Sequence, residues 1–196
     1  MYKRCAIAGF LLTVIIGFTA CAATPESTAD RTTGLTFIHL NDTYRVGAVE
    51  DGTRGGFGRV VTIIKELQEQ GREVHITHGG DFLYPSLESQ LWNGLQLVDA
   101  MNYLDALAPM YVTLGNHDFD RRTPDSLVNA VNASTFDWVS DNVEFRTGDA
   151  AADAALRSAF TFDAAGRRIG VFSVTLHAND GGNDRDYVPT DPDYLA

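Results

Sequence analysis

Four short apolar segments of this sequence each end close to a polar residue, and helical patterns separate the segments. The polar residues are Asp42, Asp81, Asn116 and Asn142, and each follows a predicted strand. Strands that alternate with helices favour an α/β domain in which the strands form one layer. In such sheets ligands bind beyond the carboxyl ends of the strands. We therefore expect a layered α/β sheet flanked by helices, with these distant residues meeting along one edge.

The expected elements follow from apolar periodicity and from turn residues. Strands are expected at residues 35–40, 74–77, 110–114 and 137–139. Helices are expected at residues 55–71, 91–107 and 124–131. A hairpin is expected further along, with strands at residues 160–163 and 168–175 joined by a turn at 164–166.

The residues behind the strands suit metal-assisted phosphoryl chemistry. Asp42 and Asp81 supply anionic oxygen ligands, and Asn116 supplies a neutral amide oxygen. His117 supplies an imidazole that serves as a ligand or as a proton donor. A carboxylate shared by two cations holds them about 3.5–4 Å apart, and such a pair neutralises a phosphoryl group. A single Asp behind a strand is more often a turn former or a helix cap, so the interpretation depends on the combination.

Four runs of the sequence resemble the motifs of one family, in the family's order. The runs are residues 37–42 (FIHLND), 79–81 (GGD) with Ser86, 115–120 (GNHDFD) and 140–142 (SDN). They resemble the 5'-nucleotidase and UDP-sugar hydrolase branch of the calcineurin-like metallophosphoesterases. The resemblance implies the layered metallophosphoesterase sheet and hydrolysis of a nucleotide phosphomonoester or pyrophosphate. It also implies two divalent metal ions, and the ligand types do not distinguish Mn, Zn, Fe, Ca and Mg.

The resemblance implies a role for each matching residue. Asp42 would bind the first metal, and Asp81 would bridge both metals. Asn116 would bind the second metal and, with His117, would contact the phosphate of the substrate. His117 would stabilise the transition state or protonate the leaving oxygen, and Asp120 would orient and charge His117.

Two positions depart from the family pattern. Tyr44 stands where the family usually has a metal-binding histidine. A phenol is a poor ligand unless it ionises, and its ordinary pKa is about 10. Two interpretations of Tyr44 stay open: it is a weak metal ligand, or it packs behind the ligands. Asp141 stands where the family usually has alanine.

Two of the family's ligand motifs are not found in this sequence. The family takes further ligands from a later histidine and from a Gly-His-x-His motif. After Thr175 the only histidine is His177, and its surroundings (LHAND, residues 176–180) resemble neither. We therefore expect residues 35–196 to be the truncated N-terminal portion of a metallophosphoesterase domain. Such a chain would hold one metal weakly and have little phosphatase activity. Two alternatives stay open: an inactive remnant, and a surface-anchored module that binds a metal or another ligand.

The first twenty residues predict export. Lys3 and Arg4 precede an apolar run at residues 5–19. This run is too short for a comfortable membrane span and has the length of a signal sequence. We therefore expect residues 1–20 to be a signal peptide and residues 21–34 to be a flexible tether.

The end of this segment resembles the cleavage site of bacterial lipoproteins. Residues 18–21 (FTAC) would place Cys21 at the new N-terminus, where it would carry lipid. The alternative is a plain secretory signal cut near Ala20 or Ala23. The lipoprotein interpretation predicts an exported protein anchored to a membrane, at its periplasmic face or at the cell surface.

Charge and cysteine content restrict the partners and the covalent structure. The 196 residues carry a formal net charge of −11. An acidic protein repels the phosphate backbone of nucleic acid, so no nucleic-acid partner is expected. Cys5 and Cys21 are the two cysteines of the sequence. Cleavage after residue 20 leaves at most one, so no internal disulfide is expected. The sequence does not specify an oligomeric state.

Overall fold

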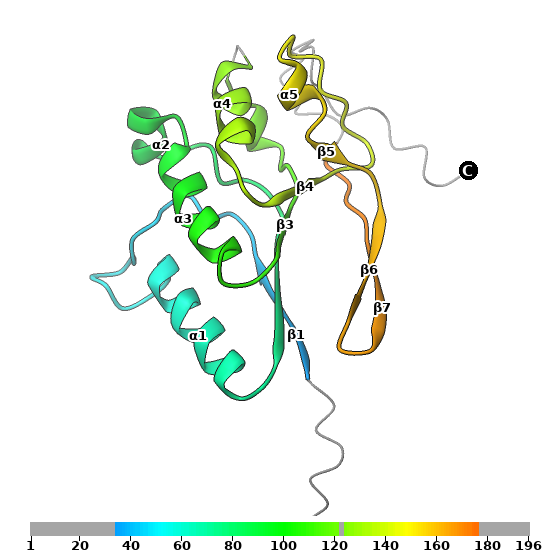
Figure 1. Cartoon of the computed structure of the whole chain (residues 1–196). Coiled ribbons are helices and arrows are strands. Elements are labelled where there is room, and N and C mark those ends of the chain that lie inside the picture. Colours follow the sequence, from blue (N-terminus) through cyan, green and yellow to red (C-terminus); the bar gives the residue numbers. More distant parts are fainter. Residues whose placement is uncertain (1–33, 122–123, 177–196) are drawn as a thin grey trace, which may run out of the picture. The chain divides into compact units, whose positions relative to one another are not determined.

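A parallel five-stranded sheet is the centre of the fold (Figure 1). The computed structural model describes residues 34–121 and 124–176. The strands lie across the sheet in sequence order, each parallel to the next: β1 (Leu35–Leu40), β2 (Glu73–His78), β3 (Met110–Val112), β4 (Asp137–Val139) and β5 (Leu156–Arg157). The α/β fold expected from the sequence is confirmed.

Helices cover one face of this sheet, and a hairpin lies on the other side (Figure 1). The helices are α1 (Phe57–Glu69), α2 (Leu87–Trp92), α3 (Leu95–Asp105), α4 (Asp125–Ala133) and α5 (Ala150–Asp153). Alternation along β2 fits this arrangement. Val74 and Ile76 belong to the core shared with the helices, whereas the ring of His75 contacts the hairpin. Successive residues of a strand point to opposite faces of a sheet, so one strand serves both layers.

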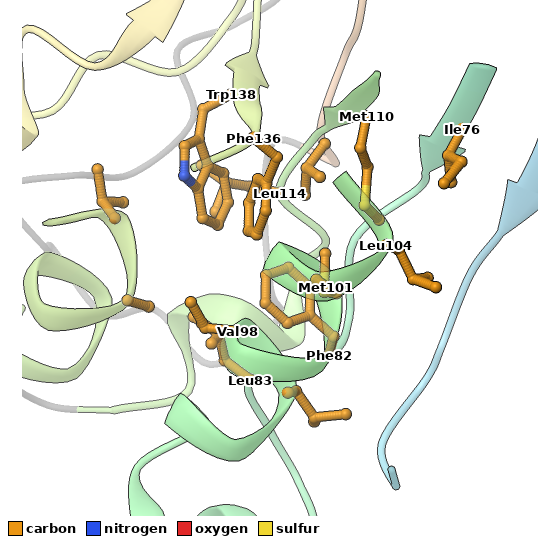
Figure 2. Packing of buried hydrophobic residues seen from close by; sticks show 14 of the residues in the cluster. Ile76, Phe82, Leu83, Val98, Met101, Leu104, Met110, Leu114, Phe136 and Trp138 are labelled. Carbon is orange, nitrogen blue, oxygen red and sulfur yellow. The ribbon is translucent and has the colours of Figure 1, made fainter. Parts of the chain in front are cut away.

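The core lies between the sheet and the helices. Helix α3 contributes four fully buried side chains, Leu97, Val98, Met101 and Leu104. Figure 2 shows side chains of α3 gathered in one cluster with aromatic residues such as Phe82. Burial of one large apolar side chain contributes about 1.5–3 kcal/mol, so this cluster is the main source of stability for the sheet and helix layers.

The hairpin forms a separate two-stranded antiparallel sheet, as expected. Its strands are β6 (Phe160–Ala164) and β7 (Arg167–Val171). The ring of Phe162 lies 4.7 Å from that of His75 and 5.2 Å from that of Tyr111, between ring centroids. These contacts attach the hairpin to the face of the large sheet away from the helices. The second strand is shorter than expected because the chain after Val171 turns to bond with the end of β4.

The helix expected at residues 91–107 is wrong in one respect, because the structure has two helices there. Asn93 and Gly94 separate α2 from α3, with φ of 53° and 81°. These left-handed conformations end a helix, and glycine adopts them without steric cost. A Cβ atom at Gly94 would lie 2.7 Å from a side-chain carbon of Leu83, which also favours glycine. The apolar period continues across the break, so periodicity alone does not reveal it.

Three short elements were not expected from the sequence. They are the 3-10 helix η1 (His117–Phe119), helix α5 and strand β5. Each has two to four residues, which is too short for a periodic pattern to show. No helix in the described ranges is long and apolar enough to cross a membrane. The predicted signal peptide, the tether and Cys21 lie outside the described residues, apart from Gly34.

Candidate metal and phosphate site

Asp42, Asp81 and Asn116 lie just beyond the carboxyl ends of β1, β2 and β3. These strands are parallel neighbours, so the three residues lie along one edge of the sheet. Backbone contacts join the loops: the N–H of Asp42 donates to the carbonyl of Gly80 at 3.2 Å. The N–H of His117 donates to Oδ1 of Asp81 at 2.7 Å. The expected convergence on one edge is confirmed.

The loops after β2 and β3 approach too closely for side chains at two glycines. A Cβ atom at Gly80 would lie 2.0 Å from the backbone nitrogen of Gly115. A Cβ atom at Gly115 would lie 2.2 Å from Oδ1 of Asp81. Asp42 and Asp81 themselves have φ of 52° and 58°, which is uncommon for residues with a side chain. Strained backbone of this kind is concentrated at functional sites, where surrounding contacts hold it.

His117 and Asp120 form a hydrogen-bonded pair beside Asp81. Nδ1 of His117 lies 2.9 Å from Oδ2 of Asp120. Helix η1 produces this contact because it places the two residues three positions apart on one turn. The hydrogen bond to Asp120 raises the pKa of His117 above its ordinary value, and the nearby carboxylates add to the rise. The imidazole is therefore oriented and favours its protonated form.

Asp118 is a buried carboxylate that sequence reasoning did not single out. Its two oxygens accept N–H groups from Asp81, Phe82, Leu83 and Gly115, at 2.9 to 3.1 Å. Burial raises the pKa of Asp118 to about 6, and the four N–H donors act in the opposite direction. The available signal was its position as the fourth residue of the run GNHD, next to the expected phosphate contact.

His78 joins the loops after β1 and β2. The N–H of Gly80 donates to Nδ1 of His78 at 3.0 Å, and Nε2 of His78 lies 2.6 Å from the hydroxyl of Thr43. Because Nδ1 accepts a hydrogen bond, the neutral ring carries its proton on Nε2 and donates it to Thr43. Burial, with a smaller contribution from the charge of His39, lowers the pKa of His78 to about 3.

Tyr44 contacts Asp42 directly. Its hydroxyl donates to Oδ1 of Asp42 at 2.9 Å. Burial raises the pKa of Tyr44 well above its ordinary value, and the hydrogen bond to Asp42 and the carboxylate of Asp81 raise it further. The hydroxyl therefore lies beside the expected ligand Asp42, and this position is compatible with both interpretations of Tyr44.

The carboxylates of the edge are suited to a cation. Burial raises the pKa of Asp81, the N–H of His117 opposes the rise, and the charge of Asp42 adds to it. Such crowding of negative charge is relieved by a bound positive ion. No three His, Cys, Asp or Glu side chains form a metal-binding group within residues 34–121 and 124–176. The oxygen donors of Asp42, Asp81 and Asn116 are of the type that hard divalent cations prefer, and a closed metal site would need further ligands.

The fourth run, residues 140–142, has a structural role. Oδ1 of Asp141 accepts the N–H of Ala159 at 2.7 Å, and Oδ2 accepts the N–H of Ser173 at 2.9 Å. The side-chain amide of Asn142 donates to the carbonyl of Thr175 at 2.7 Å and accepts its N–H at 2.8 Å. These bonds attach the segment after β7 to the end of β4. The two bonds of Asp141 explain why this chain has an aspartate where the family usually has alanine.

The sequence matches one family model over most of its length. Residues 35–195 match the model described as calcineurin-like phosphoesterase. The snake venom 5'-nucleotidase of Crotalus adamanteus is 30% identical over 146 residues, which cover 68% of this chain and 23% of that protein. The chain thus spans about a quarter of the length of this relative.

Solved structures share the fold. The 5'-nucleotidase precursor from Thermus thermophilus superposes with a TM-score of 0.65 at 24% identity, over 81% of this chain and 32% of that chain. The NAD nucleotidase of Haemophilus influenzae gives a TM-score of 0.65 at 22% identity, over 80% and 29%. At these identities the likeness shows the fold alone. With the family match over residues 35–195, the chain belongs to the calcineurin-like phosphoesterase family.

Proposed function

We propose that the protein is a metal-dependent phosphoester hydrolase of the 5'-nucleotidase type that acts on extracytoplasmic nucleotides. One observation carries the proposal. Asp42, Asp81 and Asn116 share the carboxyl edge of three parallel strands with the bonded pair His117 and Asp120. Membership of a phosphoesterase family supports the reaction class. The nucleotide as substrate is supported by relatives named 5'-nucleotidase and NAD nucleotidase.

Each residue of the edge has a task in this proposal. Asp42, Asp81 and the amide of Asn116 would hold a divalent cation, which when bound supplies positive charge that neutralises the phosphoryl group. The side chains of Asn116 and His117 would contact the phosphate. Water would form the new bond to phosphorus and release a proton to solvent as the bond between phosphorus and the leaving oxygen breaks, and His117 would give its proton to that oxygen. Asp120 keeps the imidazole oriented and raises its pKa, which favours the protonated donor before the bond breaks.

A second candidate function is a surface-anchored module that binds a metal ion or another ligand without catalysis. The donor set favours this candidate, because no three His, Cys, Asp or Glu side chains form a metal-binding group among the described residues. A two-metal site needs about seven or eight protein ligand bonds to fix both ions. The ligands of a second ion would have to come from outside residues 34–121 and 124–176.

The extracytoplasmic location is part of the proposal and rests on the N-terminal sequence. Residues 1–20 have the charge and the apolar run of a signal peptide, and Cys21 follows a small-residue cleavage site. We propose that Cys21 carries lipid and attaches the protein to a membrane. Mass spectrometry of the mature N-terminus tests this, and an unmodified N-terminus that begins after residue 21 would exclude it.

Hydrolysis assays distinguish the two candidate functions. The purified chain is assayed with Mn²⁺ on an aryl phosphate and on nucleoside 5'-monophosphates, beside Asp81→Ala. Asp163→Ala is the matched control, since Asp163 is an exposed hairpin residue that pairs with Arg168. Turnover that depends on Mn²⁺ and is lost only in Asp81→Ala supports the hydrolase.

The donor count predicts the level of activity of this chain. With ligands for one cation, we expect turnover well below the ordinary enzyme range of about 1–10³ per second. Turnover inside that range, lost in Asp81→Ala, would confirm the hydrolase and show the ligand count to be wrong. Mn²⁺ binding with no turnover supports the binding module. If the chain shows neither Mn²⁺ binding nor turnover, the hydrolase and the metal-binding module are both contradicted.

A further inference from the structure

We propose that Asp118 is a positioning residue that fixes the loop carrying Asp81 against the loop carrying Asn116. The inference rests on the proposed metal and phosphate site, because it concerns how the ligands of that site are held. Asp118 is 2% exposed and lies within the run that also contains Asn116 and His117. The expected roles of this run use the amide, the imidazole and Asp120, and they assign nothing to Asp118.

The hydrogen bonds of Asp118 connect the two loops through single atoms. Oδ2 accepts the N–H of Asp81 and the N–H of Gly115, both at 2.9 Å. Oδ1 accepts the N–H of Phe82 at 3.1 Å and that of Leu83 at 2.9 Å. Oδ2 therefore bonds at once to Asp81 and to Gly115, the residue before Asn116. A shift of either loop breaks a bond to the same oxygen.

This bonding excludes other tasks for Asp118. A carboxylate has about four lone-pair positions, and all four here point to backbone N–H groups. Neither oxygen is available to bind a metal ion or to take a proton from a substrate. Without the carboxylate the four donors would lose their acceptors, which is costly for N–H groups away from solvent. The side chain therefore acts on the chemistry through the backbone of the loops.

Asparagine cannot replace this carboxylate, although it has the same shape. Its amide oxygen can accept two of the N–H groups, but its NH₂ group would face the other two donors. Asp118→Asn should therefore release one pair of backbone N–H groups. With NH₂ at the Oδ2 position the bonds to Asp81 and Gly115 are lost, and with NH₂ at the Oδ1 position those to Phe82 and Leu83 are lost, so either orientation loosens the loop that carries Asp81.

Hydrogen exchange on the wild-type chain gives the first test. The four N–H groups of Asp81, Phe82, Leu83 and Gly115 share one acceptor side chain, so we expect them to exchange with a common opening free energy. Fast exchange of Asp81 and Gly115, with slow exchange of the neighbouring strands, would overturn the inference. This measurement needs no variant, so it holds even if Asp118→Asn fails to fold.

Mn²⁺ affinity, followed by the electron paramagnetic resonance of the free ion, gives the second test. Loss of a residue that holds metal ligands in place typically lowers metal affinity about 10- to 100-fold, and we expect Asp118→Asn to do so. Asp120→Asn controls for charge, because it removes a nearby carboxylate without touching the four N–H groups. Asp153→Asn controls for the loss of a carboxylate that holds a loop. Asp153 accepts hydrogen bonds from the N–H groups of Thr147 and Gly148, which are not part of the proposed site.

The outcomes separate this inference from the proposed function. A loss of affinity in folded Asp118→Asn that clearly exceeds the loss in both controls supports the positioning role. Equal losses of Mn²⁺ affinity in Asp118→Asn and Asp120→Asn would show that only the removed negative charge affects binding. That result would overturn the positioning role. If the wild-type chain binds no Mn²⁺, the proposed function fails, and the exchange of the four N–H groups alone decides whether Asp118 holds the loops.

Discussion

Nδ1 of His117 lies 2.9 Å from Oδ2 of Asp120, three residues further along the chain. The exposed fractions of the two side chains are 42% and 35%, so both remain within reach of solvent and of a substrate. The pair shows how a short 3-10 turn behind β3 produces an oriented imidazole with a raised pKa. An oriented proton donor is what the leaving oxygen of a phosphoester requires.

Asp120→Asn should lower the pKa of His117 toward its ordinary value, because the largest cause of the rise is the hydrogen bond to Asp120. The raised pKa means that the pair stabilises the fold below the unfolded pKa of histidine, and that this stability is lost as pH rises through the folded pKa. Titration of the His117 ring protons by NMR measures the change. An unchanged titration in the variant would show that Asp120 does not charge the imidazole.

His78 predicts a loss of stability in mild acid. Burial lowers its pKa to about 3, so the folded state keeps the ring neutral while the unfolded state binds a proton below about pH 6.5. The contribution of His78 is therefore complete above pH 6.5 and is lost as pH falls toward 3. By pH 5 the loss should reach about 2 kcal/mol.

Urea unfolding of the wild type and of His78→Gln at pH 7.5 and pH 5 isolates this effect. The difference in free energy of unfolding between the wild type and the variant should be about 2 kcal/mol smaller at pH 5 than at pH 7.5, because the variant has no imidazole to protonate. Asp118, whose pKa burial raises to about 6, changes in the opposite direction: its stability contribution falls as pH rises. Asp118 is present in both proteins and cancels in the comparison. A gap that stays constant with pH would contradict the neutral, buried state of His78.

Gly80→Ala should destabilise the chain strongly. The new Cβ atom would meet backbone of the next loop at 2.0 Å, and φ of 92° is itself unfavourable for alanine. Several kcal/mol are expected, since both a steric clash and backbone strain contribute. Gly58→Ala is the matched control, because Gly58 lies in α1 with no atom within 4 Å of a new Cβ. That control should be neutral or stabilise the chain by up to about 1 kcal/mol in thermal unfolding. Equal effects of the two changes would refute the close contact of the loops.

The layer order and the position of the site could be predicted from the sequence. Short apolar runs of strand length, each followed by a polar residue, are visible in the local sequence. Because neighbouring strands are parallel, Asp42, Asp81 and Asn116 lie on one edge of the sheet. The break at Asn93 and Gly94 could not be predicted in this way. It depends on two left-handed residues and on the packing of Leu83, while the apolar period continues through it.

The supporting contacts of the candidate site were harder to predict than the shared edge of Asp42, Asp81 and Asn116. Asp118 and Asp141 act by accepting backbone N–H groups from segments distant in sequence. No local pattern identifies such partners, because they are fixed only when the loops are folded together. Tyr44 illustrates the same limit. The sequence left a ligand and a packing role open, and the contact of its hydroxyl with Asp42 is compatible with both.

Titration of the purified chain with Mn²⁺, followed by the electron paramagnetic resonance of the free ion, tests directly whether this edge of the sheet is a metal site. We expect one Mn²⁺ per chain, with affinity at least about tenfold weaker in Asp81→Asn and unchanged in the exposed control Asp163→Asn. If the wild-type chain takes up no Mn²⁺, or if Asp81→Asn binds it as tightly as the wild type, Asp42, Asp81 and Asn116 do not form a metal site.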